Sequence, residues 1–367
     1  MDDFDFYGKS VIVRVDINSP LHPDKIEIMD NWRIKRIIPT LQELKDKNAR
    51  QIILAHQGRP GKKDFTSLEM HAKEIEKLMQ HEIKFIDDIY GQKAINEIEK
   101  LKKGEIILLD NVRKCKEEME NKDALEHSKA EMVKKLSKYA DAFVNDAFAS
   151  AHRSHCSLIG FIPVLPSFAG RLMQEEVEML DKLLKKAEKP KLFIFGGGKY
   201  ENTIEVIKYL LEKEIADKIM LAGMPANAFL GALGKIKMEA NGEIKEIWEK
   251  YKDKIILPID LINGKDIGEE SIKIFKEEIK KAKSIFISGP IGVFEKEKYR
   301  KGTKEILKEI ARTNAFKIAG GGHTIAAINM LGLEKHFSYI STGGGALERY
   351  LMGERLPVIE ALIKFKK

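Results

Sequence analysis

Short apolar runs alternate with longer amphipathic segments along the whole chain, and this alternation constrains the fold more than any other feature. The runs are nearly continuous in apolar residues, which is typical of parallel strands covered on both faces. Segments between them have helical spacing, as at Ile204, Ile207 and Leu210. The pattern predicts an α/β fold built from βαβ units. The candidate strands are Val11–Val15, Gln51–Ala55, Glu105–Leu109, Ala142–Val144, Leu192–Phe195, Lys218–Ala222, Ile255–Leu257, Ser284–Ile287, Phe316–Ala319 and Ser338–Ile340.

The strand pattern is interrupted near the middle of the chain. Two prolines lie in Phe161–Pro166, and Arg171–Lys186 has the spacing of a long amphipathic helix. A length of 367 residues suits two domains of about 100–200 residues each. We therefore expect two doubly wound parallel-sheet domains joined by a hinge helix. The expected ranges are 1–168 for the first domain, 169–187 for the connecting helix, 188–352 for the second domain and 353–367 for a tail.

Composition excludes several classes of protein. Hydrophobic residues make up 43% of the chain, too many for a disordered protein, and no apolar run reaches the roughly 20 residues that span a membrane. The acidic N-terminus lacks the features of a secretory signal. Cys115 and Cys156 lie far apart and predict neither a disulfide framework nor a zinc site, so a reducing, cytoplasmic location is expected. The net charge of +7 accompanies no nucleic-acid-binding motif, so neither nucleic acid nor membrane is an expected partner.

Charged and amide side chains follow the candidate strands of the first half. Ligands of open parallel sheets bind beyond the carboxyl ends of the strands, so these residues would converge at one edge. Arginine recurs among them, and its forked guanidinium matches the geometry of carboxylate and phosphate. The pattern predicts a pocket for a compact, multiply charged anion, although each arginine taken alone also suits an ordinary surface position. The residues concerned are Asp16, Asn18, Arg33, His56, Arg59, Arg113 and Arg153.

Glycine follows the candidate strands of the second half. Three Gly-Gly-Gly runs, at 196–198, 320–322 and 343–345, each stand between a candidate strand and a helical segment, and Gly223 and Gly289 follow other strands. Glycine permits close approach of the backbone, and a helix N-terminus presents free N–H groups to an anion. Together the runs predict a polyphosphate site. The spacings of the P-loop and dinucleotide-binding fingerprints are absent, which disfavours a dehydrogenase.

The strand-end motifs, taken together, resemble those of the phosphoglycerate kinase family, and the likeness covers nearly the whole chain. The resemblance implies reversible phosphoryl transfer between 1,3-bisphosphoglycerate and ADP, giving 3-phosphoglycerate and ATP, with Mg²⁺ carried by the nucleotide. It also implies that residues 353–367 return to the first domain. The matching strings, in family order, are Val13–Pro20, Asp30–Ile34, Ile38–Leu41, Ala55–Pro60, Asp110–Arg113, Val144–Phe148, His152–His155, Gly289–Glu295 and Ile340–Gly345.

The resemblance implies a role for each matching residue. Arg33 and Lys199 would be the catalytic residues that act on the transferring phosphoryl group. The residues implied to hold the phosphoglycerate are Asp16, Asn18, Arg33, His56, Arg59, Arg113 and Arg153. Those implied to bind the nucleotide are Gly197, Lys199, Gly223, Glu295, Gly320, Gly321, Gly322 and Thr324.

Some positions depart from the usual family pattern. His323 stands where many members carry the Asp that approaches the metal, and imidazole is a poor ligand for Mg²⁺, so the protein ligands of the metal stay unknown. Thr203 replaces a lysine, and Ser288 replaces an asparagine. Gly-Gly-Gly-His and the small residue at 203 resemble archaeal members. Two alternatives stay open: a nucleotide- or anion-binding homologue with altered catalysis, and a kinase of another small acid.

Overall fold

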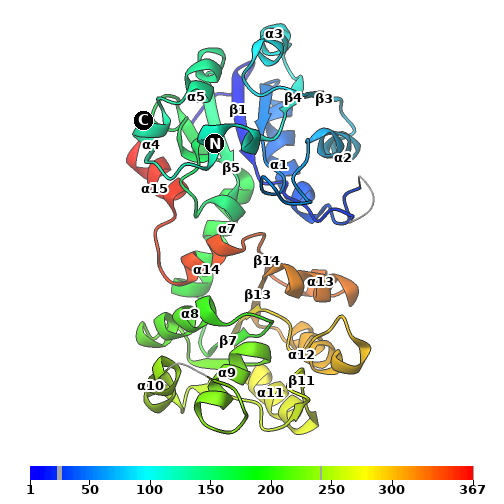
Figure 1. The fold of residues 1–367 in the computed structure, drawn as a ribbon, viewed down its shortest axis with the longest axis vertical. Coiled ribbons are helices and arrows are strands. Elements are labelled where there is room, and N and C mark those ends of the chain that lie inside the picture. The colour runs from blue at the N-terminus through cyan, green and yellow to red at the C-terminus, as the bar shows by residue number, and fades with distance from the viewer. Residues whose placement is uncertain (23–26, 240–241, 367) are drawn as a thin grey trace. The chain divides into compact units, whose positions relative to one another are not determined.

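The computed structural model describes residues 1–22, 27–239 and 242–366. The chain divides into two compact units (Figure 1). Unit 1 comprises Met1–Val177 and Arg355–Lys367, and unit 2 comprises Glu178–Glu354. Within the described residues, each unit is built around a six-stranded sheet in which every pairing is parallel. The predicted α/β class with two doubly wound parallel sheets is confirmed.

The sheet of unit 1 has the strand order β3-β4-β2-β1-β5-β6. The chain first adds strands on one side of β1 and later adds strands on the other side, so the strand order reverses between β1 and β5. Ligands of such sheets bind at this reversal point, beyond the carboxyl ends of the strands. Val11, Val13 and Val15 of β1 are fully buried, as expected for a central strand covered on both faces. The strands are β1 (Ser10–Val15), β2 (Arg50–Leu54), β3 (Ile83–Ile86), β4 (Ile106–Leu109), β5 (Ala142–Asp146) and β6 (Ser167–Ala169).

Amphipathic helices cover this sheet, and α1 shows why they form. Ile34, Ile37, Leu41 and Leu44 recur every three or four residues and are all fully buried, so one face of α1 packs on the core. The helices of unit 1 are α1 (Trp32–Asp46), α2 (Glu69–Met79), α3 (Gln92–Lys100), α4 (Ala124–His127), α5 (Glu131–Leu136), α6 (Cys156–Ile159) and α15 (Pro357–Lys364). Short 3-10 turns form η1 (Val112–Lys114), η2 (Lys116–Met119), η3 (Ser137–Tyr139) and η4 (Phe148–Ser150).

The last helix, α15, belongs to unit 1 although it follows all of unit 2 in the sequence. It is the red helix that lies against the green part of the chain in Figure 1, where it contacts α6. Val358 is fully buried, and its backbone N–H donates to the carbonyl of Ala151 at 3.3 Å. Unit 1 takes up the chain again from Arg355 onward, two residues after the start of the expected tail at 353.

Helix α7 (Arg171–Asp181) leads from unit 1 into unit 2. The sequence placed the end of the first domain at 168 and the start of the connecting helix at 169, but Ala169 is the last residue of the edge strand β6, and the helix begins two residues later. After Asp181 the helix continues as a wider π-helical turn, η5 (Lys182–Lys186). The division between the compact units falls inside α7, after Val177.

The sheet of unit 2 has the order β14-β13-β12-β7-β8-β9, which reverses between β7 and β12. Its strands are β7 (Lys191–Phe195), β8 (Lys218–Leu221), β9 (Ile255–Ile256), β12 (Ser284–Ser288), β13 (Phe316–Gly320) and β14 (Tyr339–Ile340), and β10 (Leu261–Ile262) pairs with β11 (Asp266–Ile267) in a separate antiparallel ladder. The helices are α8 (Glu201–Glu212), α9 (Gly223–Ala232), α10 (Gly242–Tyr251), α11 (Glu269–Lys281), α12 (Lys301–Arg312), α13 (Gly322–Met330) and α14 (Gly345–Leu351), with 3-10 turns η6 (Glu297–Tyr299) and η7 (Glu334–His336). Among the described residues no helix has the length and apolar character needed to cross a bilayer.

Asp146, the last residue of β5, fixes the start of α7. Its Oδ1 accepts a hydrogen bond from the backbone N–H of Met173 at 2.9 Å, in the first turn of the helix, where such groups otherwise lack partners. The carboxyl is fully buried, and burial raises its pKa to about 6. The chain passes so close to it that a Cβ on Gly170 would lie 2.3 Å from Oδ1. Only glycine fits at residue 170 without moving the carboxyl.

We expect Gly170→Ala to destabilise unit 1 by about 1–3 kcal/mol, because the methyl group must displace the buried Asp146 carboxyl. Trp32 in α1 and Trp248 in α10 are the two tryptophans, so denaturant unfolding followed by fluorescence in a Trp248→Phe background reports on unit 1. Gly242→Ala, measured in a Trp32→Phe background, is the control, since no atom lies within 4 Å of its added Cβ. An unchanged unfolding midpoint for Gly170→Ala would contradict the expected clash.

Candidate active site

The residues predicted to bind an anion gather at the carboxyl edge of the unit 1 sheet. They come from different elements that end at this edge, and electrostatic interactions link them. Asp16 and Asn18 follow β1, Arg33 lies in the first turn of α1, His56 and Arg59 follow β2, Arg113 lies in η1 after β4, and Arg153 follows η4.

Asp16 connects several of these side chains. Its Oδ1 accepts a hydrogen bond from Arg33 at 3.2 Å, and its Oδ2 accepts one from the Ser150 hydroxyl at 2.6 Å. Burial alone would raise the pKa of this carboxyl, but the charges of Arg33 and His56 and the Ser150 hydrogen bond hold the pKa well below its usual range. Asp16 is therefore ionised at neutral pH and holds Arg33, whose side chain remains 31% exposed.

His56 lies behind Asp16 and is buried. Its Nδ1 is 3.1 Å from a terminal guanidinium nitrogen of Arg14, a fully buried arginine of β1. Burial lowers the pKa of His56 well below 6.5; Asp16 opposes this shift, and the charges of Arg14, Arg113 and Arg153 add to it. The ring is neutral at physiological pH. Sequence reasoning assigned no role to Arg14, because a charged residue inside a strand shows its partners only when the chain is folded.

Positive charge exceeds negative charge at this edge. Arg113 is buried, one of its terminal nitrogens donates to the carbonyl of Gly58, and its Nε meets no hydrogen-bond acceptor in the described part of the chain. Burial and the charges of Arg153 and Arg14 lower the pKa of Arg113 to about 10, so it stays protonated. Burial, together with repulsion from Arg59 and Arg33, also lowers the pKa of Arg153. A bound anion would relieve this mutual repulsion.

Glycine-rich turns meet at the β7–β12 reversal of the unit 2 sheet. The backbone N–H of Gly197 donates to Pro290 at 2.8 Å, and Met224 donates to the carbonyl of Gly197 at 2.9 Å. Gly223 has a φ of +55°, and a Cβ there would lie 2.6 Å from the Gly197 oxygen. Gly289, after β12, has a φ of +89° and would clash in the same way with Gly196. The close packing of three strand ends therefore requires glycine.

The turn from β13 into α13 lies beside this packing. Gly320 ends the strand, Gly321 has a φ of +87°, and α13 begins at Gly322. Thr324, in the first turn of α13, is buried, and its hydroxyl accepts a hydrogen bond from the backbone N–H of Gly289 at 2.7 Å. This contact joins the turn after β12 to the helix N-terminus, whose free N–H groups favour anions.

Two of the positions that depart from the family pattern line one cavity. Thr203 and Ser288 border a space of about 40 Å³ together with Gly321 and Gly343. The space exceeds what one ordered water needs, about 10–15 Å³ on the same measure. The smaller side chains at these positions thus leave room beside the glycine turns.

Lys199, Glu295 and His323 lie at the surface of unit 2. Lys199 is exposed in the turn between β7 and α8. Nδ1 of His323 lies 3.1 Å from Oε1 of Glu295, and their side chains are 78% and 50% exposed. Since an ionised carboxylate only accepts, Nδ1 carries a proton in this pair. Across the described ranges, no three His, Cys, Asp or Glu side chains gather closely enough to hold a metal ion.

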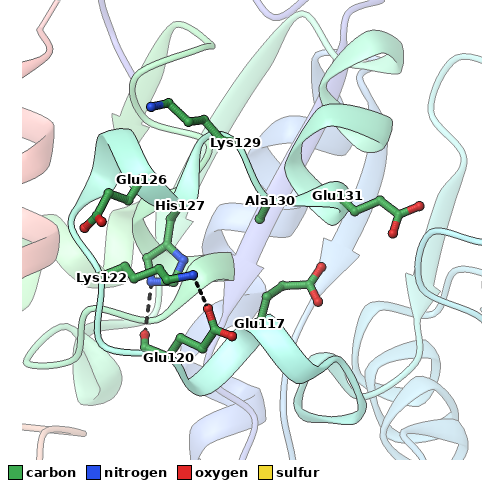
Figure 2. Close-up of a pocket in the computed structure, with 8 residues that line it drawn as sticks. All are labelled: Glu117, Glu120, Lys122, Glu126, His127, Lys129, Ala130 and Glu131. Carbon is green, nitrogen blue, oxygen red and sulfur yellow. Dashed lines mark hydrogen bonds and ion pairs between the residues drawn. The ribbon is translucent and has the colours of Figure 1, made fainter.

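Unit 1 also contains a hollow that none of the predicted site residues lines (Figure 2). It measures about 510 Å³ and is lined by Glu117, Glu120, Lys122, Glu126, His127, Lys129, Ala130 and Glu131. Lys122 pairs with Glu120 at 2.5 Å, and Nε2 of His127 contacts the carbonyls of Glu120 and Ser154 at 3.1 and 2.8 Å. The lining charges are of both signs, so the arginine-rich edge suits a multiply charged anion better than this hollow.

Comparisons with known proteins establish the family. The sequence model of the family described as phosphoglycerate kinase matches residues 1–265 and 262–354. The phosphoglycerate kinase of Methanothermus fervidus is 42% identical over 398 aligned positions, which cover 100% of this chain and 97% of that protein. The chain belongs to the phosphoglycerate kinase family. The phosphoglycerate kinase of Archaeoglobus fulgidus is also 42% identical to this chain, and the alignment covers 100% of this chain and 96% of that protein.

Solved structures of phosphoglycerate kinases share the fold. The crystal structure from Pyrococcus horikoshii has a TM-score of 0.93 at 36% identity and covers 100% of this chain and 99% of its own. The structure from Coxiella burnetii has a TM-score of 0.83 at 31% identity, with coverage of 100% and 99%.

Family membership confirms the activity that the motifs predict. The chain is a phosphotransferase with a carboxyl group as acceptor, acting between 1,3-bisphosphoglycerate and ADP in one direction and 3-phosphoglycerate and ATP in the other. The predicted resemblance to archaeal phosphoglycerate kinases is confirmed as well, since relatives from archaea match over the full chain. Members of the family use ATP or ADP with Mg²⁺.

We expect Gly223→Ala to weaken ATP binding by about 10-fold or more, because the added Cβ forces apart the packed turns at Gly197. Gly234→Ala is the matched control: Gly234 follows the same helix, has a φ of +68° and has no atom within 4 Å of an added Cβ. Both variants carry the strain of a positive φ, and only the first carries the clash. Titration calorimetry with MgATP compares them; equal affinities would argue against a nucleotide role for the turns.

Proposed function

We propose that unit 1 holds the phosphoglycerate and unit 2 holds the nucleotide, each at the reversal point of its own sheet. The observation that carries this proposal is the arginine-rich edge of unit 1, where buried and repelling guanidinium groups outnumber the carboxylates. A compact anion with a phosphate and a carboxylate supplies the missing negative charge. The glycine turns of unit 2 offer backbone N–H groups instead, which suit a longer polyphosphate.

Each group of the acid is assigned to side chains that can donate or accept the hydrogen bond it needs. Asp16 can only accept, so it suits the hydroxyl of the glycerate, and Asn18, whose Oδ1 already accepts from the Gly58 N–H at 2.8 Å, offers its amide N–H₂. The anionic ends of the substrate require donors. We assign these ends to Arg33, His56, Arg59, Arg113 and Arg153.

Each part of the nucleotide is likewise assigned to groups of unit 2 that can contact it. Gly197 and Gly223 border the base because their lack of side chains leaves backbone at the surface of the packed turns, and the carboxylate of Glu295 accepts from the ribose hydroxyls. The phosphates lie at the N-terminus of α13, against Gly320, Gly321, Gly322 and Thr324, with Lys199 as the cation. Mg²⁺ enters as part of the substrate MgATP. We expect nucleotide oxygens and water to hold it, since His323 offers nitrogen and Mg²⁺ prefers oxygen.

The chemistry requires no general base. The attacking group is the carboxylate of 3-phosphoglycerate, which is ionised at neutral pH because carboxyl groups have pKa values of about 4. A bond forms between its oxygen and the γ-phosphorus as the bond to the bridging oxygen of ADP breaks. Rate acceleration then comes from positioning and from charge stabilisation by Arg33 and Lys199. Because the substrates are assigned to different units, the bound acid and nucleotide must be brought together for each transfer.

The direct test is a coupled assay of purified protein with 3-phosphoglycerate and MgATP that monitors formation of the acyl phosphate. Assays with 2-phosphoglycerate and with glycerate run in parallel. Turnover with 3-phosphoglycerate alone supports the proposal. Preferred turnover of another acid would indicate a kinase of a different substrate, and nucleotide binding without turnover would indicate a homologue with altered catalysis.

We expect Arg33→Ala to lower kcat by about 10²–10³-fold or more, since it removes a charge that the transition state requires. Its affinity for MgATP should stay unchanged, because the nucleotide is assigned to unit 2. Arg50→Ala is the control, as Arg50 starts β2 at the opposite edge of the same sheet. Loss of ATP affinity in Arg33→Ala, measured by calorimetry, would refute the assignment of the two substrates to different units.

Lys199→Ala should give the complementary result. We expect a comparable loss of kcat with 3-phosphoglycerate affinity retained, because Lys199 is assigned to the transferring phosphoryl group and not to the acid. Calorimetry with 3-phosphoglycerate alone checks the second part. A large loss of acid affinity would show that this lysine acts elsewhere than proposed.

A further inference from the structure

A buried chain of hydrogen bonds runs behind the arginine-rich edge and ends at His56. Oε1 of Glu118 accepts from the Ser157 hydroxyl at 2.8 Å, and the oxygen of Ser157 accepts from Nε of Arg14 at 2.8 Å. A terminal nitrogen of Arg14 lies 3.1 Å from Nδ1 of His56. The four side chains range from 0% to 3% exposed. The proposed function uses only the last of them.

The two charged groups fix the direction of every bond in this chain. Burial would raise the pKa of Glu118, but the nearby His155, the charge of Arg14 and the backbone N–H of Ser157 keep the pKa below its ordinary value, so Glu118 is ionised and can only accept. A guanidinium can only donate. Ser157 must therefore donate to Glu118 and accept from Arg14, and Nδ1 of His56 must accept from Arg14.

A neutral imidazole whose Nδ1 accepts carries its one proton on Nε2. We infer that Arg14 is a positioning residue that holds His56 as the neutral Nε2–H tautomer, so that the ring donates one hydrogen bond to the bound phosphoglycerate. Among the described residues, none accepts a hydrogen bond from Nε2. The inference rests on the proposed function, because the acceptor that it assigns to Nε2 is the substrate anion.

Arg14 is fully buried, and three of its five N–H groups already have partners. Its Nε donates to Ser157, one terminal nitrogen donates to the carbonyl of Val15, and the other donates to His56. Buried Glu118 and Asp16 oppose its charge. Arg14 therefore differs from Arg33 and Arg153, which keep part of their surface open.

The charges that face His56 come from several elements. Asp16, after β1, favours the imidazolium, whereas Arg14 of β1, Arg113 of η1 and Arg153 after η4 disfavour it. Burial is the largest influence and acts in the same direction as the arginines, so the pKa of the ring lies well below 6.5. The ring keeps one form through the range of about pH 6–8 in which free histidine changes charge.

The first test observes the ring in the unaltered protein. Nitrogen-15 labelling of histidine reports the protonation of each ring nitrogen, and a His56→Asn variant assigns the signal. We expect a protonated Nε2 and an unprotonated Nδ1 throughout about pH 6–8. A ring that takes up a proton within this range, or that carries its proton on Nδ1, would overturn the inference.

The second test removes the donor. In Arg14→Met we expect the pKa of His56 to rise toward 6.5 and the KM for 3-phosphoglycerate to rise about 10-fold with a smaller change in kcat, because the lost hydrogen bond acts in the bound ground state as well. The ratio of kcat/KM between variant and unaltered enzyme should rise as the pH falls, since protonation restores a donor at Nε2. The ionisation of the substrate phosphate affects kcat/KM of both enzymes equally, so its effect cancels in the ratio. A ratio that does not change with pH would contradict the inference.

Arg50→Met is the matched control for this variant. Nε of Arg50 donates to the Ser10 hydroxyl at 2.8 Å, so the same type of bond is lost at the opposite edge of the sheet. The His56 signal and the KM should not change. If Arg14→Met does not fold, Ser157→Ala is the second variant, since it removes a hydrogen-bond partner of Arg14 while keeping the charge of Arg14. We then expect part of the His56 population to shift to the Nδ1–H tautomer. An unchanged His56 tautomer would contradict the role of the hydrogen-bond chain.

Addition of 3-phosphoglycerate to the labelled protein separates the inference from the proposed function. A shift of the Nε2 signal with Nδ1 still unprotonated supports both. A ring in the expected tautomer that does not respond to the ligand would overturn the donor role and place the error in the proposed binding site. A ring in the other tautomer that does respond would overturn the inference alone.

Discussion

Repulsion among the arginines at the carboxyl edge of unit 1 is the constraint on which the rest of this site depends. The fold opposes it with two buried carboxylates: Asp16 holds Arg33, and Glu118 opposes Arg14. Carboxylates buried in this way keep their charge only because cations surround them. The charge that remains after this pairing is positive, so the edge is stable enough to fold and still attracts an anion.

The proposed assignment gives the two units different physical means of binding anions. Unit 1 uses side chains, whose forks and rings can distinguish a phosphate from a carboxylate or a hydroxyl. In the proposed assignment, unit 2 uses backbone N–H groups at the N-terminus of α13, beside Gly321 and Gly322, which can donate to phosphate oxygens without reading the rest of the ligand. If the assignment holds, specificity for the acid depends on side-chain packing in unit 1, whereas nucleotide binding depends on the backbone path in unit 2.

Apolar runs and glycine positions were enough to predict the main strands, because strand burial and close backbone approach are local requirements. The edge strands β3 and β6 were missed because both are short and partly polar, and the β10–β11 ladder was missed because Asn263, Gly264 and Lys265 interrupt its apolar residues. The roles proposed for Arg33 and His56 came from motifs. Glu118 could not be singled out, because it lies among other glutamates and only the folded chain buries it.

The return of α15 to unit 1 means that the whole of unit 2 is an insertion in the chain of unit 1. Leu356, Val358 and Ala361 are buried and belong to the segment that unit 1 takes from beyond unit 2. Domains generally form in the order in which a ribosome releases them. Here unit 1 contains segments on both sides of unit 2 in the sequence, so unit 2 can complete its sheet first, and unit 1 gains the side chains of α15 only after the segment from Arg355 onward has been synthesised.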